Sequence, residues 1–416
     1  MKRILVLNHF PTVYPPTSGG TLRYFHFYHR LSQYYDITLL SQTYRRELHV
    51  IEFTPTFREY QVERDVLHEQ MNMDMENQNS YESALIMNVK LSQYPTVYKK
   101  YFDILYKSSD IIIHESPYLL GYDQYFGLDH KLRIYSSQNH EYVLADQLWE
   151  NKKAREFLPC IYELEKKLVE NADLVFATSW QERDSFSTMY KIDPIKIKLA
   201  PNGIHPEDWV RTETTSNTRL KAFFIGAEYP PNIESVHYIL HHLADHCPQI
   251  DFIIAGGCCN PFQRLKKPTI KHGRRVKNKE KPKPFKPNVQ LVGRVNEEEK
   301  LKLFASVDIA INPMFKGAGV NLKTLEFLSS GIPLFSTNFG VRGLNLIDGK
   351  HYIHAERENF AEKLNEFYLD KEYLKEISTR GQTYIHDNYS WHNIAKSVQV
   401  EIDDAINKKA VCDKQS

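Results

Sequence analysis

Short apolar runs alternate with longer amphipathic stretches along most of the first half of the chain. The apolar runs have strand length, and several begin directly after an aspartate. They are RILVLN from Arg3, DITLL from Asp36, DIIIH from Asp110, LRIYS from Leu132, DLVFATS from Asp173 and IKLAPN from Ile197. Residues 22–31 place apolar and aromatic side chains at helical spacing, and Ser179 with Glu182 forms a capping box that opens a helix at Trp180. This alternation predicts parallel strands joined by crossover helices.

The same alternation begins again in the second half, after a polar stretch without apolar period at 207–219. Its apolar runs are AFFIGA from Ala222, DFIIAGG from Asp251, VQLVG from Val289, DIAINP from Asp308 and IPLFST from Ile332. Three helical segments follow Arg357, and the last one, from Ser390, is long enough to return to the first domain. We therefore predict domains over 1–205 and 220–388, a linker over 206–219, and a C-terminal helix over 389–416 that packs on the N-terminal domain.

Two stretches depart from this pattern. Residues 63–100 are rich in Met, Gln, Asn and Tyr, and we expect a helical elaboration of the first domain there. Residues 264–287 hold eleven Lys or Arg against one Glu, together with four prolines. That composition predicts a flexible loop rather than a sheet element.

Composition narrows the class of protein. The 416 residues are 42% hydrophobic and 25% charged, as expected for two folded domains, and the net charge of +1 gives no whole-molecule attraction to nucleic acid. No apolar run approaches the roughly 20 residues of a membrane span, and the start MKRILVLN is too short for a secretory signal. Five cysteines without C-x-x-C spacing favour neither disulfides nor zinc, so we expect a cytoplasmic protein.

Two glycine-containing segments are candidates for ligand binding. Gly19 and Gly20 lie between the first strand and a helix, where backbone amides can meet an anion or a sugar, or where a turn simply needs glycine. No G-x-G-x-x-G follows that strand and no P-loop lysine motif is present, so a dinucleotide oxidoreductase and an NTPase lose support. Residues 316–326, KGAGVNLKTLE, predict a glycine loop at the head of a helix. Such a loop suits a diphosphate, and Glu326 could accept the ribose hydroxyls or be a solvated helix residue.

The second segment carries a family resemblance. Residues 317–344, GAGVNLKTLEFLSSGIPLFSTNFGVRGL, resemble the donor-site block of the retaining, GT-B-fold glycosyltransferases of family 4, also called group 1. Other features follow in that family's order: Gly19-Gly20, Asn139-His140-Glu141, Ser179 with Glu182, Pro201-Asn202-Gly203-Ile204, Ile225-Gly226 with Pro230-Pro231-Asn232, and Trp391. The resemblance implies an α/β protein of two Rossmann-like domains that face a central cleft, with the C-terminal helix crossing back to the first domain.

The resemblance also implies an activity and a set of site residues. The activity is transfer of a sugar from a nucleotide-sugar donor to a hydroxyl of a glycan, lipid-linked or polymer acceptor, as in polysaccharide biosynthesis, with retention and without metal or cofactor. Donor-binding residues would be Gly20, Gly226, Arg294, Gly317, Ala318, Gly319, Val320, Asn321, Lys323 and Glu326. Gly19, Asn139 and Glu141 would lie on the acceptor side, and His140 would be catalytic, beside the transferred sugar, unless it only packs or caps a helix.

Two departures from the family pattern concern charge. Ala318 stands where the first glutamate of the family's E-x7-E motif is expected, and Glu326 matches the second. The family's Arg and Lys pair on the diphosphate is not evident, so Arg294 and Lys323 are the available cations. We therefore expect the amides of the glycine loop to contribute more of the diphosphate's stabilisation.

Alternative readings remain open at this point. Ala318 gives weight to a noncatalytic sugar-nucleotide or glycan-binding protein of the same fold, and the basic stretch 264–287 to a glycosyltransferase acting on nucleic acid. The same stretch could attach the protein to an anionic membrane at its cytoplasmic face, or be a solvated loop. No D-x-D follows a strand, and no Ser-His-Asp or Cys-His set can be assembled, so neither a metal site nor nucleophilic hydrolysis is predicted.

Overall fold

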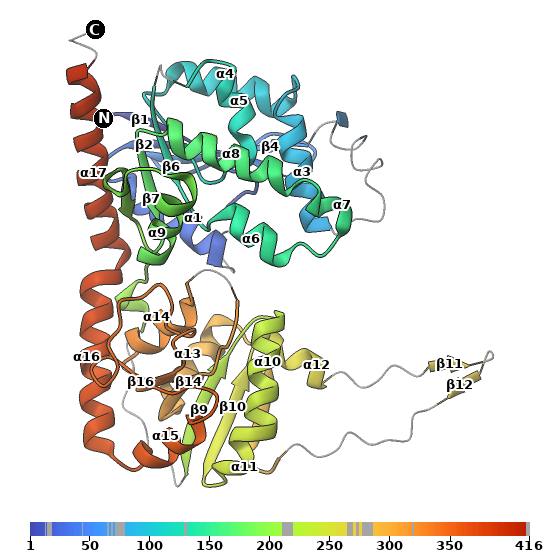
Figure 1. Ribbon diagram of the computed structural model, residues 1–416, viewed down its shortest axis with the longest axis vertical. Coiled ribbons are helices and arrows are strands. Elements are labelled where there is room, and N and C mark those ends of the chain that lie inside the picture. Colours follow the sequence, from blue (N-terminus) through green and yellow to red (C-terminus); the bar gives the residue numbers. More distant parts are fainter. Residues whose placement is uncertain are drawn as a thin grey trace. The chain divides into compact units, whose positions relative to one another are not determined.

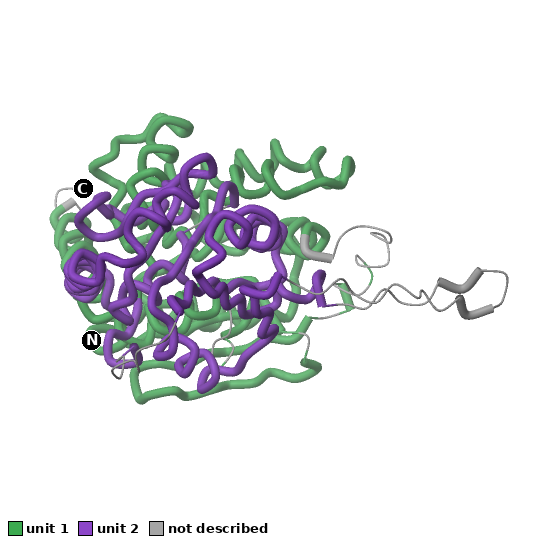
Figure 2. Tube along the Cα trace, turned by 90° about the horizontal axis from the view of Figure 1, so that it is seen from below, with its two compact units in different colours: residues 1–203, 391–416 green, residues 204–390 purple. Residues whose placement is uncertain are grey.

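Two mainly parallel β-sheets organise the chain, one in each of two units (Figure 2). The first unit comprises Met1–Gly203 and Trp391–Ser416, and the second comprises Ile204–Ser390. The computed structural model describes residues 1–12, 14, 19–43, 45–64, 66–67, 70, 80–128, 131–209, 219–263, 269–271, 274–276, 286–317 and 320–412. The chain passes between the units after Gly203 and after Ser390, close to the predicted domain ends at 205 and 388.

The sheet of the first unit has eight strands in the order β3-β4-β2-β1-β5-β6-β7-β8. Strands β1, β2, β4, β6 and β7 of this sheet are labelled in Figure 1. The strands are β1 (Arg3–Leu7), β2 (Asp36–Thr43), β3 (His49–Thr54), β4 (Phe57–Glu63), β5 (Ile111–His114), β6 (Leu132–Ser136), β7 (Leu174–Ala177) and β8 (Ile197–Leu199). All neighbours run parallel except β3 and β4, which form an antiparallel pair. The apolar runs therefore become buried central strands, as a parallel sheet covered on both faces requires.

Alternate side chains of each strand enter different cores. In β1, Ile4 and Val6 pack with helix α1 (Gly19–Leu31), whereas Leu5 and Leu7 pack with α4 (Val97–Ser108) on the other face. The further helices of this unit are α3 (Ser80–Leu91), α5 (Leu120–Gln124), α6 (Glu141–Leu148), α7 (Lys152–Arg155), α8 (Leu158–Asn171), α9 (Trp180–Tyr190), η1 (Pro117–Leu119) and η2 (Pro194–Lys196). Helix α3 confirms the expected helical elaboration; residues 65, 68–69 and 71–79 of that stretch lie outside the described residues.

The C-terminal helix α17 (Trp391–Cys412) completes the core of the first unit. Trp391, Ile394, Val398 and Ile402 recur at helical spacing and are buried with residues of α1 and of the central strands. The Tyr35 hydroxyl donates to Asp403 at 2.7 Å. The prediction that the terminal helix crosses back to the first domain is therefore confirmed.

The sheet of the second unit has six parallel strands in the order β13-β10-β9-β14-β15-β16. They are β9 (Leu220–Ile225), β10 (Ile250–Ala255), β13 (Val289–Gly293), β14 (Ile309–Asn312), β15 (Leu334–Ser336) and β16 (Ile353–His354). The helices are α10 (Pro230–Tyr238), the π-helix η4 (Ile239–Leu243), α11 (Ala244–His246), η5 (Gly257–Cys259), α12 (Asn260–Gln263), α13 (Glu297–Ser306), α14 (Leu322–Ser329), α15 (Phe360–Phe367) and α16 (Lys371–Tyr389). Two hydrophobic clusters cover the faces of this sheet.

The structure bears on three further predictions, which concern the basic stretch, the linker and membrane spans. Within the basic stretch, β11 (Thr269–Lys271) and β12 (Arg274–Val276) form an antiparallel two-stranded sheet, so the expectation of no sheet element is wrong there; 264–268, 272–273 and 277–285 lie outside the described residues. The start of the predicted linker is a 3-10 helix, η3 (Pro206–Trp209), whose Trp209 is buried in the second unit, and 210–218 lie outside the described residues. No helix among the described residues is long and apolar enough to cross a membrane.

Candidate functional site

The carboxyl ends of parallel strands are where open α/β sheets bind ligands. In the second unit, β9, β10, β14 and β15 run parallel, so the loops that follow them start at the same edge of the sheet. These loops contain most of the predicted donor-binding residues. All predicted donor-binding residues except Gly20 thus belong to the second unit.

The loops after β9 and β10 approach each other closely enough to require glycine. Gly256 has a φ of +93°, and a Cβ on it would lie 2.2 Å from the carbonyl oxygen of Gly226. A Cβ on Gly226 would lie 2.7 Å from Cγ of Asn232. Gly226, a predicted donor-side residue, thus has a packing role at this edge, because any side chain there would displace Asn232 or the loop.

Lys323, on the first turn of α14, has a buried ammonium group. Its Nζ donates to Oδ1 of Asn232 at 2.7 Å and lies 4.3 Å from the ring centroid of Phe224. Burial lowers the pKa of Lys323 to about 8, against the opposing influence of Cys258 and Glu326. The structure therefore places one of the two predicted cations at the carboxyl edge, bound to the amide that begins α10.

Glu326 lies one turn further along α14 and is held by a lysine that the sequence did not single out. Nζ of Lys300, on α13, donates to Glu326 Oε1 at 2.8 Å, and both side chains are about 15% exposed. Burial raises the pKa of Glu326, whereas the positive charge and hydrogen bond of Lys300 act to lower it. Glu326 is thus not a solvated helix residue, and that alternative is excluded.

The glycine loop precedes α14 and is braced by the turn after β15. Gly317 has a φ of +136°, and its carbonyl accepts a hydrogen bond from Arg342 Nη1 at 3.1 Å. The Asn321 side chain donates to the carbonyls of Phe339 and Gly340, at 3.1 and 3.2 Å. Val320 packs against the core, and the predicted residues Ala318 and Gly319 lie outside the described residues. Asn321 therefore positions the loop through its side chain.

Arg294, the other predicted cation, is an exposed residue. Its side chain is 76% exposed, and its Nη2 lies 4.0 Å from Glu228 Oε2. Glu228 also accepts a hydrogen bond from Asn260 at 2.6 Å. Arg294 thus directly follows β13 near the carboxyl edge, and its guanidinium group faces the carboxylate of Glu228.

The carboxyl edge of the first unit holds buried polar residues of its own. Gly20 lies against Gln138, whose Oε1 would be 3.2 Å from a Cβ on that glycine, while Gly19 opens α1. Gln138 donates to Glu115 Oε2 at 2.6 Å, and burial raises the pKa of Glu115. Arg23, 2% exposed, donates to the carbonyl of Pro201 at 3.0 Å.

His140 occupies the N-cap position of α6 without a capping hydrogen bond from its side chain, and both ring nitrogens have protein partners. Nδ1 lies 2.8 Å from the Ser185 hydroxyl, and Nε2 lies 3.0 Å from that of Tyr190. Burial lowers the pKa of His140 to about 4, so the imidazole is neutral at pH 7. These contacts favour the alternative that His140 packs inside the first unit; its catalytic role stays a prediction.

The neighbours of His140 belong to a buried carboxyl network. Glu141 accepts from the Tyr118 hydroxyl at 2.8 Å, and its backbone amide donates to Glu165 Oε1 at 2.9 Å. Burial, followed by the charge of Glu165, raises the pKa of Glu141 to about 8. The carbonyl of Asn139 accepts from Ser137 at 2.6 Å. Glu141, predicted on the acceptor side, is thus buried inside the first unit, where its hydrogen bonds can orient the loop that it follows.

Sequence reasoning missed two cations of the second unit. Arg342 lies inside the segment GVRGL, but only the fold shows that this turn reaches Gly317. Lys300 lies in the charged run NEEEKLKLF, where no spacing separates it from its solvated neighbours. The described residues contain no group of three or more His, Cys, Asp or Glu that could hold a metal ion.

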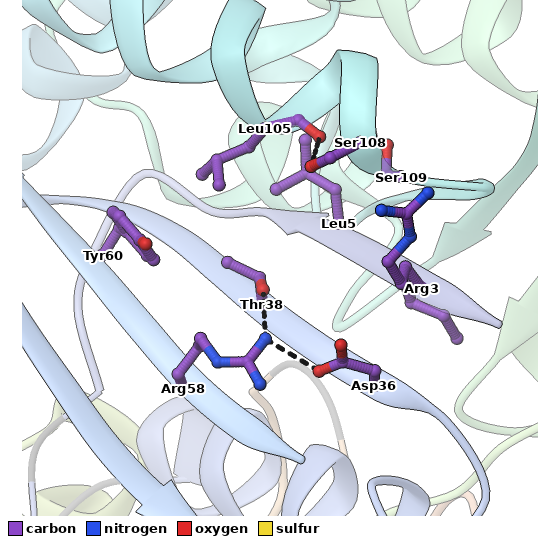
Figure 3. Close-up of a pocket in the computed structure, with 10 residues that line it drawn as sticks. Arg3, Leu5, Asp36, Thr38, Arg58, Tyr60, Leu105, Ser108 and Ser109 are labelled. Atoms are coloured by element: carbon purple, nitrogen blue, oxygen red, sulfur yellow. Dashed lines mark hydrogen bonds and ion pairs between the residues drawn. The ribbon is translucent and has the colours of Figure 1, made fainter. Parts of the chain in front are cut away.

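A separate cavity lies at the opposite, amino-terminal edge of the first sheet. It has a volume of about 190 Å³ and is lined by residues of β1, β2, β4 and the end of α4. Figure 3 shows Arg58 there, whose Nη1 lies 2.7 Å from Asp36 and 3.3 Å from the Thr38 hydroxyl. It contains none of the predicted site residues.

Known proteins resemble this chain in sequence and in fold. Residues 219–370 match the family described as "Glycosyl transferases group 1". A Klebsiella pneumoniae protein, named "Uncharacterized 44.6 kDa protein in cps region", is 24% identical over 309 residues, which cover 71% of this chain and 74% of that protein. The family match confirms the resemblance seen in the sequence, and it lies in the unit that holds Lys323 and Glu326.

Solved structures share the fold over nearly the whole chain. Sucrose-phosphate synthase from Thermosynechococcus elongatus has a TM-score of 0.68 at 13% identity, covering 98% of this chain and 100% of that one. An E. coli structure entitled "Trehalose-6-phosphate" and bound with UDP-2-fluoro glucose has a TM-score of 0.67 at 11% identity, with 97% and 99% covered. Anabaena HepE in complex with UDP and glucose has a TM-score of 0.62 at 12% identity, with 97% and 100% covered. The fold is therefore GT-B, as predicted, and the family match supports sugar transfer from a nucleotide sugar.

Proposed function

We propose that this protein is a retaining glycosyltransferase that moves a sugar from a nucleotide-sugar donor to a hydroxyl of a glycan, lipid-linked or polymer acceptor. The donor is proposed to bind at the carboxyl edge of the second unit. Two of the similar structures hold UDP or a UDP-sugar, so uridine nucleotides are the first candidates. The relative from a cps region supports an acceptor in polysaccharide assembly.

The observation that carries the proposal is the pair of buried charges on α14. Lys323 and Glu326 lie one helical turn apart, directly after the glycine loop and inside the region that matches the group 1 family. A helix start with a cation suits a diphosphate, and a carboxylate one turn later suits two ribose hydroxyls. One nucleotide can use all three features together.

The proposed chemistry is same-face substitution at the anomeric carbon. The bond from that carbon to the diphosphate oxygen breaks, and the acceptor hydroxyl oxygen forms the new bond on the same face. The departing diphosphate accepts the proton of the hydroxyl, so no protein nucleophile is required. The chain's contribution is to position both substrates and to stabilise the negative charge of the leaving group through Lys323 and loop amides.

The first unit is proposed to supply the acceptor side. Gly19 and Gly20 begin α1 at its carboxyl edge, and Asn139, His140 and Glu141 follow β6 at the same edge. The buried contacts of His140 and Glu141 suit positioning of that loop, while a direct role for His140 beside the sugar remains the alternative.

A transfer assay with a panel of nucleotide sugars tests the proposal. We expect one nucleoside diphosphate to be released in the presence of a glycan or lipid-linked acceptor, activity to persist in EDTA, and the product to keep the anomeric configuration of the donor. The coupling constant of the anomeric proton distinguishes retention from inversion. Nucleotide binding without transfer or donor hydrolysis would instead support the noncatalytic sugar-nucleotide-binding alternative.

The basic stretch is proposed to attach the protein to an anionic surface at the cytoplasmic face of the membrane. Residues 264–287 carry eleven Lys or Arg, and each can add about 1 kcal/mol near an acidic membrane at low salt. Sedimentation with phosphatidylglycerol vesicles at low salt tests this, with a variant whose basic residues are replaced by Ser as the control. Failure of the unmodified protein to sediment would leave a solvated loop, and tight DNA binding with a steep salt dependence would favour a nucleic-acid acceptor.

A further inference from the structure

The carboxylate of Glu326 is held in an unsymmetrical way. Lys300 Nζ donates to Oε1 at 2.8 Å, whereas no described residue donates to Oε2. The free oxygen belongs to the carboxylate proposed above to bind the ribose. The ion pair thus fixes one oxygen and leaves the other for a ligand.

Lys300 is itself fixed from two sides. The Nζ atom of Lys300 lies 5.0 Å from the ring centroid of Trp209, a residue of η3 that is 9% exposed. The ring of Trp209 packs on that of Phe304, which lies on α13 like Lys300, with 4.9 Å between the ring centroids. Asn296 and Glu299 form a capping box that sets the start of α13. The lysine therefore has a cation–π partner and a rigid helix behind it, in addition to Glu326.

We propose that Lys300 is a positioning residue for nucleotide binding, which holds the carboxyl group of Glu326 oriented toward the ribose. This rests on the proposed function of Glu326 and adds a residue on a different helix. Without the ammonium group, the carboxylate would keep its burial and lose its principal counter-charge.

The charges around Glu326 determine the direction of the effect. From α13 it faces Lys300, which lowers its pKa, and Glu297, which raises it and is 84% exposed. Lys323, on its own helix, also lowers its pKa. From α16, Gln382 and His386 contact Ser329 at the far end of α14. Loss of Lys300 therefore moves the pKa of Glu326 further upward, so that a larger fraction of the carboxyl is protonated at a given pH.

The test uses the full-length protein and uridine diphosphate as the probe. For Lys300→Met we expect the dissociation constant to rise about tenfold at neutral pH and to return toward the unmodified value as the pH rises, because a larger fraction of the variant carboxyl is then ionised. Lys300→Arg should restore most of the affinity. Taking the ratio of variant to unmodified constants at each pH removes the titration of the diphosphate itself.

A matched control comes from the same helix. Lys302 pairs with Glu298 at 2.6 Å, with side chains 71% and 77% exposed, and we expect Lys302→Met to leave affinity and its pH profile unchanged. In a Glu326→Gln background, Lys300→Met should add no pH dependence, and this cycle separates the effect of the pair from a general loss of folding.

The outcomes distinguish this inference from the proposed function. If the unmodified protein binds no uridine, guanosine or adenosine diphosphate, the proposed function fails. If nucleotide binds and Glu326→Gln weakens it, but folded Lys300→Met and Lys300→Gln bind like the unmodified protein at every pH, the positioning role of Lys300 is wrong while the function stands.

Discussion

The buried charges around Glu165 in the first unit and around Glu326 in the second unit differ in how many protein groups hydrogen-bond to them. In the first unit, Glu165 accepts four hydrogen bonds from the fold, and His140 has a partner on each nitrogen. In the second unit, Lys300 pairs with one oxygen of Glu326, and among the described residues the Lys323 ammonium group donates one hydrogen bond, to Asn232.

This difference distinguishes polar groups that stabilise the fold from polar groups that can bind a ligand. A buried carboxylate whose two oxygens both accept hydrogen bonds from the fold stabilises one arrangement, whereas a carboxylate with one unpaired oxygen can accept hydrogen bonds from a ligand. We therefore expect substitutions of Glu165 and His140 to change stability, and substitutions of Glu326 and Lys323 to change nucleotide affinity.

The largest expected effect is on the stability of the first unit. Glu165→Ala removes the acceptor for the hydroxyls of Tyr135 and Tyr190 and for two backbone amides. We expect the free energy of unfolding to fall by about 3 kcal/mol or more, since each buried donor left unsatisfied costs about 1–3 kcal/mol. Urea denaturation measures this. Glu163→Ala, at an exposed position of the same helix, should be near neutral, and equal midpoints for the two variants would refute the network.

The next effect is on nucleotide affinity at the second edge. Glu326→Ala should weaken binding of uridine diphosphate by roughly 1.5–3 kcal/mol, the contribution of hydrogen bonds to a charged group. Titration calorimetry measures it, and Glu298→Ala on the exposed face of α13 is the control. An unchanged dissociation constant in a folded variant would remove Glu326 from the site.

The sequence predicted the elements of the fold more completely than the side-chain contacts of the site. Apolar runs gave the central strands and the loop, helix and strand around residues 316–336, because buried strands and a glycine loop leave local patterns. The antiparallel β3–β4 pair went unpredicted, since HVIEFT and FREYQVE mix polar and apolar residues at a sheet edge. Partners across the fold, such as Lys300 for Glu326 and Tyr190 for His140, leave no local pattern, and these decide which charges are satisfied.

The His140→Ala variant distinguishes the packing role of that residue from its predicted catalytic role. We expect a loss of about 1–2 kcal/mol in unfolding free energy, because Ser185 and Tyr190 each lose a buried partner. Turnover and the Michaelis constant are then measured at a temperature where the variant is folded. A fall in kcat of about tenfold or more, with little change in donor affinity, would restore the predicted catalytic role.

The smallest effect is a pH dependence carried by Glu141. Its pKa is raised to about 8 in the folded protein, so its contribution to stability is present below the unfolded pKa of about 4.3 and is lost as the pH rises toward 8. His140, with a pKa lowered to about 4, acts in the opposite direction below about pH 6.5. Between about pH 6.5 and 8, Glu141→Gln should therefore flatten the decline of stability by about 1 kcal/mol, measured by denaturation at each pH.

Hydrogen exchange with and without uridine diphosphate tests the central claim most directly, because it reports which edge holds the nucleotide. We predict the strongest protection in peptides covering 224–232 and 315–330 of the second unit, and its disappearance in Glu326→Ala at the same nucleotide concentration. Protection that is confined to the first unit, or that persists unchanged in Glu326→Ala, would contradict the account.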